Sequence, residues 1–281
     1  MAIAGKVAII TGATSGVGRG VAVEFARRGA KVIATGRRRS EGDELEKSAR
    51  ADGHDLTFVG ADVTSEADCD RVAEAAVAAH GRIDVLVCNA GIVNDPAVVD
   101  THTASLEWWN QIVTTNLTGT FLSCRAVLPQ MMSQYSGVIL AISSINAEVP
   151  VSRMAAYNCS KAAITQFTRT LAIEYLMYGI RANTVILGAT HGSTNDAVNQ
   201  SVMAHAEGGP LTIEELENNR QINEALGEKP ENVGAALALL ASDELAGMTA
   251  TNVHLDRGLA AGFLTDMAIY KTVSDQWSFA T

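Results

Sequence analysis

The sequence predicts an α/β fold built on one doubly wound parallel sheet of about seven strands, with helices on both faces. Short β-branched runs alternate with helical patterns along the whole chain, which is typical of this class. Apolar residues make up 47% of the 281 residues and aromatic residues only 5%, so Ala, Val, Ile and Leu must form the core. That composition suits strands buried between two layers of helices.

Seven runs have the length and the β-branched content of buried strands. They lie near residues 6–10, 30–35, 56–60, 83–88, 137–142, 181–186 and 251–255, with helices expected between them. No Gly-rich or Pro-rich linker interrupts the alternation, so we expect a single domain over residues 1–281.

The first strand, Lys6 to Ile10, runs straight into a glycine-rich turn, Thr11 to Gly18, and a helix follows at once. This helix carries an apolar stripe and ends before Gly29, where the second strand begins. In such a Rossmann-like unit, glycines let the backbone approach a pyrophosphate that lies at the helix N-terminus. The turn therefore predicts a dinucleotide site that includes Gly12, Thr14, Ser15, Gly16, Val17 and Gly18.

The end of the second strand indicates which dinucleotide binds. A carboxylate usually holds the ribose hydroxyls there in NAD-binding units, whereas this chain has Gly36-Arg37-Arg38-Arg39. An arginine at this point can pair bidentately with a 2′-phosphate. We therefore expect Arg37 and Arg38 to favour NADP(H). The alternative is an NAD(H) enzyme in which the arginines only solvate a loop.

Tyr157 and Lys161 stand four residues apart on an expected helix, thirteen residues after Ser144. Positions i and i+4 share one helix face about 5–6 Å apart, so the Lys161 ammonium can lie beside the Tyr157 phenol. An adjacent cation favours the phenolate and lowers the pKa of a phenol from its usual value of about 10. The pair predicts a tyrosine that transfers a proton near neutral pH, with Ser144, or alternatively Ser143, orienting the reacting oxygen.

Four motifs follow one another at the spacing of one known family: Gly12-x-x-x-Gly16-x-Gly18, Asn89-Ala90-Gly91, Asn116, and Ser144 with Tyr157-x-x-x-Lys161. By these motifs the chain resembles the short-chain dehydrogenase/reductase family over roughly residues 5–262. The resemblance implies an oxidoreductase that passes a hydride between a nicotinamide cofactor and a carbinol carbon.

The resemblance implies four catalytic residues: Asn116, Ser144, Tyr157 and Lys161. In this family the tyrosine moves the proton, the serine stabilises the oxygen, and the lysine lowers the pKa of the phenol and binds the nicotinamide ribose. The asparagine holds a water that joins the lysine to solvent. A hydrogen bond to neighbouring backbone is the alternative role for Asn116.

The resemblance also implies further cofactor contacts. Asn89, Ala90 and Gly91 follow a buried strand, where small residues let a cofactor ring lie close to the backbone; an ordinary turn is the alternative. Asp62 and Val63 resemble the pair that borders the adenine. An N-cap or Asx turn is compatible with that role of Asp62.

One segment departs from the family pattern. The family usually has Pro-Gly followed by a threonine that touches the nicotinamide carboxamide, whereas this chain has Leu187-Gly188. Gly188 and Thr190 are the expected cofactor contacts, with Ser193 and Thr194 as alternatives for the hydroxyl. His191 is expected to be an exposed loop residue rather than a substrate contact.

Composition limits the partners. A formal net charge of −10 and a pI of about 5.1 argue against a nucleic-acid groove or an anionic membrane surface. The four cysteines have no metal-binding spacing, so we expect no metal and a reduced, cytoplasmic location. No apolar run reaches the roughly 18 residues of a membrane span, so we expect no membrane partner.

The least regular segment, residues 188–232, is expected to be a lid over a small-molecule substrate. Apolar residues in and near it are expected to line the pocket: Ala147, Val149, Val151, Met154, Met203 and Leu211. Arg220 is the only Lys or Arg between residues 188 and 228, so no basic group converges on a charged substrate. We therefore expect a neutral, mostly apolar secondary alcohol or ketone, such as a terpenoid, alicyclic, aromatic or steroid compound.

Two other functions fit parts of the sequence. A nucleotide-sugar epimerase or dehydratase also uses Tyr-x-x-x-Lys, but usually has another glycine spacing and an added substrate domain. A nicotinamide-cofactor sensor that has lost catalysis would explain the altered Leu187-Gly188 region. The tail, residues 263–281, contains four aromatic residues and is expected to pack on its own subunit or on a neighbour in a homo-oligomer, a tetramer or a dimer.

Overall fold

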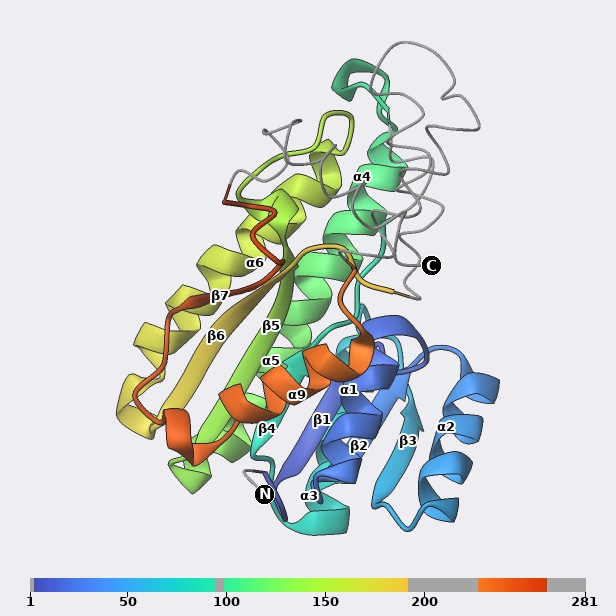
Figure 1. The fold of residues 1–281 in the computed structure, drawn as a ribbon, viewed down its shortest axis with the longest axis vertical. Helices are drawn as coiled ribbons and strands as arrows, with labels where there is room; N and C mark the ends of the chain where they lie inside the picture. The colour runs from blue at the N-terminus through green and yellow to red at the C-terminus, as the bar shows by residue number, and fades with distance from the viewer. Residues whose placement is uncertain (1–2, 94–98, 192–226, 262–281) are drawn as a thin grey trace, which may run out of the picture.

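Seven parallel strands form one sheet in the order β3-β2-β1-β4-β5-β6-β7 (Figure 1). The computed structural model describes residues 3–93, 99–191 and 227–261. The strands are β1 (Val7–Thr11), β2 (Lys31–Gly36), β3 (Leu56–Gly60), β4 (Val85–Cys88), β5 (Gly137–Ser144), β6 (Ile180–Leu187) and β7 (Asn252–Leu255). The predicted fold class is confirmed, and each predicted strand overlaps an observed one.

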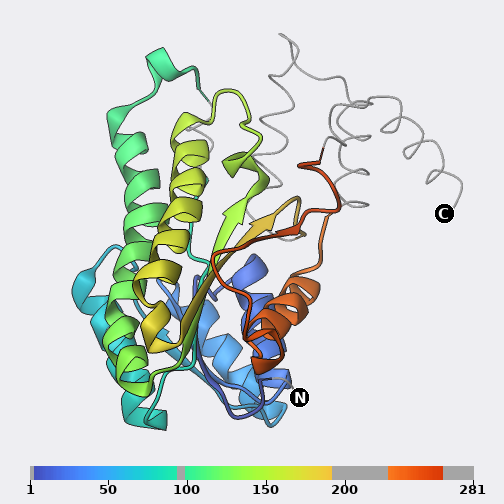
Figure 2. The same cartoon turned by 90° about the vertical axis from the view of Figure 1, so that its left-hand side faces the viewer.

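Helices cover both faces of this sheet. The α-helices in the described ranges are α1 (Gly16–Arg27), α2 (Arg39–Ala51), α3 (Glu66–His80), α4 (Leu106–Val113), α5 (Gly119–Gln134), α6 (Ala155–Glu174) and α9 (Pro230–Leu240). Helices α1, α2 and α9 pack on one face, and α3, α5 and α6 pack on the other. Figure 2 shows α5 and α6 on one side of the sheet and α9 on the other.

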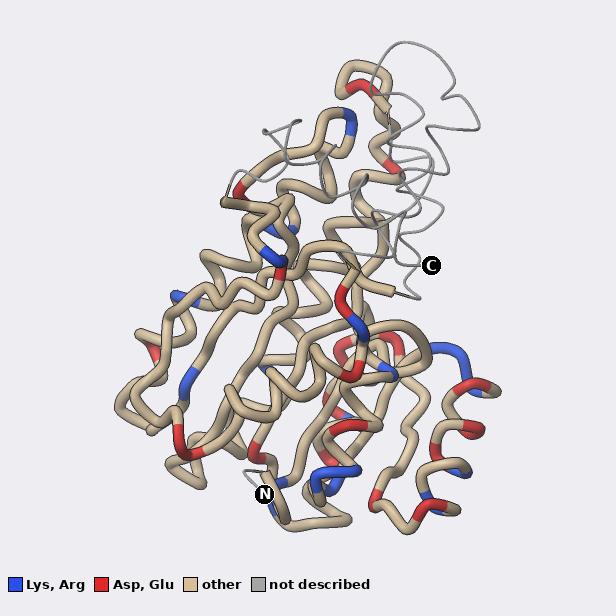
Figure 3. Tube along the Cα trace, viewed as in Figure 1, with Lys and Arg blue, Asp and Glu red and all other residues tan. Residues whose placement is uncertain are grey.

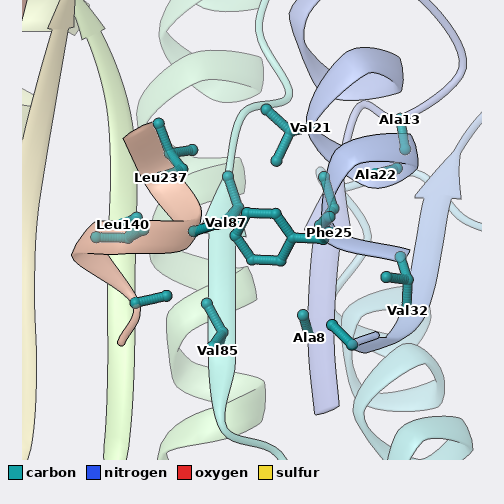
Figure 4. Close-up of a cluster of buried hydrophobic side chains, with 14 of the residues drawn as sticks. Ala8, Ala13, Val21, Ala22, Phe25, Val32, Val85, Val87, Leu140 and Leu237 are labelled. Carbon is teal, nitrogen blue, oxygen red and sulfur yellow. The ribbon is translucent and has the colours of Figure 1, made fainter. Parts of the chain in front are cut away.

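The two faces of the sheet have separate cores because side chains alternate along each strand. Ala8 and Ile10 of β1 face the α1 and α9 layer, whereas Val7 and Ile9 face the α3 and α5 layer. Phe25 is fully buried and reaches from α1 toward Val87 of β4 (Figure 4). Burying such a ring contributes about 1.5–3 kcal/mol, so it fixes α1 and the turn before it against the sheet.

The order of the strands reverses between β1 and β4. The chain passes from β1 outward to β2 and β3 and then returns to β4, which pairs with the other side of β1. In open parallel sheets, ligands bind outside the carboxyl ends of the strands at such a reversal, because the connections diverge there and leave a crevice.

A π-helical turn, η3 (Thr114–Thr118), joins α4 to α5 and carries Asn116. The sequence analysis did not predict it. Single π-helical turns inside longer helices occur frequently at functional sites, because the extra residue changes the direction of the side chains.

Most of the predicted lid, residues 192–226 of the segment 188–232, lies outside the described residues, as do the tail 263–281 and Ser193, Thr194, Met203, Leu211 and Arg220. Among the described helices, none is both long and apolar enough to cross a membrane.

Candidate active site

A cleft of about 450 Å3 opens at the carboxyl edge of the sheet, where the ends of β1 to β6 meet the start of α6. Nearly all of the predicted site residues line it: Gly12, Thr14, Ser15, Gly16, Val17, Gly18, Arg37, Arg38, Asp62, Val63, Asn89, Ala90, Gly91, Ser144, Tyr157, Lys161, Gly188 and Thr190. Asn116 does not line the cleft, and neither do Ala147, Val149, Val151 and Met154, which the sequence analysis expected to line the substrate pocket. The cleft also contains residues that the sequence analysis did not single out, namely Ala61, Ile92, Val93, Thr115 and Ile142. Most of these neighbour a predicted residue in the chain.

The glycine-rich turn after β1 is held against the turn after β4. Asn89 Nδ2 donates to the carbonyls of Thr11 and Gly12 at 3.0 and 3.3 Å. Thr11 Oγ1 accepts from the backbone N–H groups of Asn89 and Ala90, each at 3.0 Å. A Cβ on Gly18 would lie 2.3 Å from both Gly12 O and Asn89 Nδ2, so this approach requires glycine. Thr11, the first residue of the predicted glycine-rich turn, thus joins this turn to the turn after β4.

Basic residues lie where β2 leads into α2 (Figure 3). The Arg38 guanidinium reaches back over the turn after β1, donating to Thr14 Oγ1 at 2.9 Å and to Ser15 Oγ at 2.5 Å. Arg37 also lines the cleft. Arg39, in contrast, is directed toward Asp43, with their charged atoms 3.9 Å apart and its side chain 82% exposed. Two of the three arginines therefore border the cleft.

Asp62 forms an Asx turn and also lines the cleft. Its Oδ1 accepts from the backbone N–H and the hydroxyl of Thr64, both at 2.9 Å. The Asx turn expected as an alternative role for Asp62 is thus present, and it is compatible with a position beside a bound ligand.

Ser144, at the end of β5, and Tyr157, in the first turn of α6, meet at one end of the cleft and are hydrogen-bonded. Lys161 lies one turn further along α6, and its Nζ is 5.6 Å from the centroid of the Tyr157 ring. Lys161 Nζ donates to the carbonyl of Ile142 at 3.0 Å. Ser143 Oγ instead donates to the backbone carbonyl of Lys161 at 2.9 Å. Of the two serines, Ser144 is therefore the one beside the phenol.

Burial shifts the pKa values of both the Tyr157 phenol and the Lys161 ammonium. Loss of hydration raises the pKa of the Tyr157 phenol, and the hydrogen bond with Ser144 offsets only part of that rise. Burial lowers the pKa of the Lys161 ammonium to about 8. In the free protein the pKa of Tyr157 is thus raised and not lowered as the sequence analysis expected, because dehydration of the phenolate outweighs the opposing effect of Ser144.

Asn116 is fully buried behind the cleft. Its Oδ1 accepts from the backbone N–H of Ile92 at 2.8 Å, and its Nδ2 donates to the carbonyl of Ile92 and to Ser160 Oγ, each at 3.1 Å. The two bonds to Ile92 are hydrogen bonds to backbone, which is the alternative role of Asn116 in the sequence analysis. A Cβ on Gly91 would lie 3.3 Å from Asn116 Oδ1, slightly closer than usual, and 3.6 Å from Lys161 Nζ, so Gly91 borders both the asparagine and the lysine.

The loop after β6 keeps its glycine although Leu187 replaces the family proline. A Cβ on Gly188 would lie 2.9 Å from Leu259 Cδ1 and 3.0 Å from Asp256 Cα. Thr190 is buried and forms a β-bridge with Glu228. The backbone N–H of His191 donates to the Glu228 carbonyl at 3.0 Å, and His191, which is partly buried, is not one of the described residues that line the cleft.

Similarity to known proteins identifies the class to which this fold and cleft belong. Residues 6–202 match the short chain dehydrogenase family model. An uncharacterised oxidoreductase of Thermotoga maritima is 35% identical, covering 92% of this chain and 98% of its own length. The 3beta-hydroxysteroid dehydrogenase 1 of Eggerthella lenta is 33% identical, covering 91% of this chain and 94% of its own.

Among solved structures, an actinorhodin polyketide ketoreductase variant with NADPH is similar, with a TM-score of 0.83 and 29% identity over 91% of this chain and 97% of its own. The protein belongs to the short-chain dehydrogenase family. Proteins of this family use nicotinamide cofactors.

The buried Lys161 ammonium predicts a pH-dependent cost to folding. Its folded pKa of about 8 lies below the value of about 10.4 for an unfolded chain, so the cost is complete well below pH 8 and falls as the pH rises toward 10. Lys161→Met removes the charge. We expect the difference in unfolding free energy, variant minus wild type, to be about 2 kcal/mol larger at about pH 7 than at about pH 9.5.

Urea denaturation at the two pH values measures this difference. Lys47→Met, at an exposed position on α2, is the control for the loss of one positive charge. A difference for Lys161→Met that does not vary with pH would contradict the buried charge.

Proposed function

We propose that this enzyme transfers a hydride between NADP(H) and a neutral, mostly apolar secondary alcohol or ketone. The observation that carries the proposal is one continuous cleft that has Arg37 and Arg38 at one end and Ser144, Tyr157 and Lys161 at the other. Its volume of about 450 Å3 and its lining suit a dinucleotide whose phosphate-bearing ribose lies near the arginines and whose nicotinamide lies near the phenol.

The chain's residues fit such a cofactor. The positions of Gly12 and Gly18 leave no room for a side chain, so the turn after β1 presents bare backbone. The N-terminal end of α1 has no acidic residue in its first turn and suits a pyrophosphate. Bound NADP(H) supplies or accepts the hydride.

In the proposed mechanism Tyr157 carries the proton to or from the substrate oxygen. Ser144, which is hydrogen-bonded to this phenol, holds the same oxygen in line with it. Lys161 supplies a positive charge behind the phenol and lies near enough to bind the nicotinamide ribose. We assign Asn116 the supporting role of fixing Ile92 and Ser160, and thereby the start of α6, against the turn after β4.

The proposed preference for NADP(H) rests on Arg38. Its side chain is held over the turn by Thr14 and Ser15, and Arg38 lines the cleft, so its guanidinium can pair with a 2′-phosphate there. Glu41 is the nearby acid, 3.8 Å from Arg38, and lies on α2 rather than at the end of β2. The NADPH found with the similar ketoreductase is consistent with this choice.

The proposed substrate class rests on a small apolar cluster beside the phenol. Val93 and Met154 are buried there, with Val151 and Tyr157 packed against them. Val93 also lines the cleft. Such a surface favours an apolar ring and penalises a charge that finds no partner. One similar protein is a 3beta-hydroxysteroid dehydrogenase, which supports the proposal.

A substrate panel tests this function. Neutral alicyclic, aromatic and steroid alcohols and ketones are compared with phosphorylated and carboxylated compounds, and NADPH and NADH absorbance reports turnover. We expect kcat/KM to be at least about tenfold higher for the best neutral compound, a difference of about 1.4 kcal/mol in transition-state binding. Higher kcat/KM for the charged compounds would refute the substrate class.

Tyr157→Phe is the matched control for that panel. Loss of the proton carrier should lower kcat on the order of 10²–10⁴-fold, whereas cofactor affinity should persist. A variant that retained most of its turnover would remove Tyr157 from the mechanism.

A second prediction concerns cofactor choice. Arg38→Ala and Arg37→Ala should each weaken NADPH binding by roughly tenfold or more, because each removes a charge-assisted hydrogen bond, and should change NADH binding little. Arg39→Ala, on the residue paired with Asp43, is the control and should alter neither affinity. Calorimetric titration measures the dissociation constants of both cofactors for the three variants and for wild type. Equal losses for NADPH and NADH would overturn the assignment.

A further inference from the structure

A chain of side-chain amides runs from Ser144 away from the cleft. Ser144 Oγ accepts from the backbone N–H of Asn146 at 3.2 Å and donates to Asn146 Oδ1 at 3.3 Å. Asn146 Nδ2 donates to Asn158 Oδ1 at 3.0 Å. Asn158 Nδ2 in turn donates to the carbonyl of Val151 at 2.7 Å. Asn146 and Asn158 are not among the residues that line the cleft in the described structure.

The last hydrogen bond of this series, to the Val151 carbonyl, determines how the side-chain amides of Asn158 and Asn146 are turned. The Val151 carbonyl can only accept, so Asn158 must turn its Nδ2 toward it and its Oδ1 toward Asn146. Asn146 must then turn its Nδ2 toward Asn158, which leaves its Oδ1 facing Ser144. The hydroxyl of Ser144 is therefore held by one donor and one acceptor of the same residue.

Ser144, Asn146 and Asn158 also connect the end of β5 to the first turn of α6. Asn146 lies in η4 (Ile145–Ala147), the short turn that follows β5, and Asn158 follows Tyr157 on α6. A hydrogen bond between their side chains thus sets the end of β5 against the first turn of α6. Ser144 and Tyr157 lie directly beside that contact.

We propose that Asn146 and Asn158 are positioning residues that set the hydroxyl of Ser144 opposite the phenol of Tyr157. The inference rests on the proposed function, in which Ser144 holds the substrate oxygen. At 3.3 Å the bond from Ser144 to Asn146 Oδ1 is long and weak, so the hydrogen can turn to a substrate oxygen at little cost. The N–H of Asn146 meanwhile keeps the serine oxygen in place.

A kinetic double-mutant cycle tests the proposal with Ser144→Ala, Asn146→Ala and the double variant, using the best substrate of the panel and NADPH. If Asn146 acts through Ser144, Asn146→Ala should lower kcat about three- to tenfold in wild type and leave the cofactor Kd unchanged, because the variant keeps the backbone N–H but loses the 3.0 Å bond to Asn158 that sets the turn against α6. In the Ser144→Ala background the same change should have no further effect. Asn158→Ala should follow the same pattern and replaces Asn146→Ala if that variant does not fold.

Asn252→Ala is the matched control. Asn252 donates to Glu148, just after the same turn, at 3.0 Å, so its loss loosens the turn without touching Ser144. We expect wild-type kcat within about twofold. A loss as large as that of Asn146→Ala would mean that the amides have only a structural role.

The outcomes separate this inference from the function itself. Full turnover in Ser144→Ala would refute the proposed role of Ser144 and this inference with it. An impaired Ser144→Ala, with Asn146→Ala equally damaging in both backgrounds, would overturn the inference alone.

Discussion

Lys161 holds its ammonium at the carboxyl edge of the sheet with only 6% of the residue exposed, and the surrounding elements are arranged to accept that charge. Its Nζ donates to the carbonyl of Ile142, while Ser143 donates to the backbone carbonyl of Lys161. These two bonds join the end of β5 to the middle of α6. Because α6 is fixed there, Tyr157, one turn earlier, is fixed beside Ser144.

The turn after β4 completes the enclosure of this charge. Gly91 borders both Asn116 and Lys161, and Asn116 joins Ile92 to Ser160 on α6. Burying the ammonium is unfavourable in free energy, and packing elsewhere in the fold offsets this, as is common at functional sites. An anionic, polar ligand in the cleft would offset part of that cost, since Lys161 lines it.

The backbone of the site could be predicted because it depends on local patterns. β-branched runs fixed the strand ends, and parallel strands bring those ends to one edge. Gly18 and the i, i+4 pair Tyr157 and Lys161 carry their geometry in their spacing. The π-helical turn around Asn116 could not be predicted, because it adds one residue to a helical repeat without altering the apolar pattern. The contact of Asn146 with Asn158 could not be predicted either, because it forms only when two distant segments pack. The pKa of Tyr157 also depends on burial, which only the assembled fold determines.

The ionisation of Tyr157 tests most directly whether this buried phenol is the proton carrier. The ultraviolet absorbance of phenolate, taken as wild type minus Tyr157→Phe across pH, follows this residue alone. In the free protein we expect a midpoint above about 10, since burial raises the pKa. With saturating NADP⁺ we expect a lower midpoint, because the positive charge of the oxidised nicotinamide beside the phenol favours the phenolate. A midpoint that NADP⁺ leaves unchanged would contradict the proposed role of Tyr157.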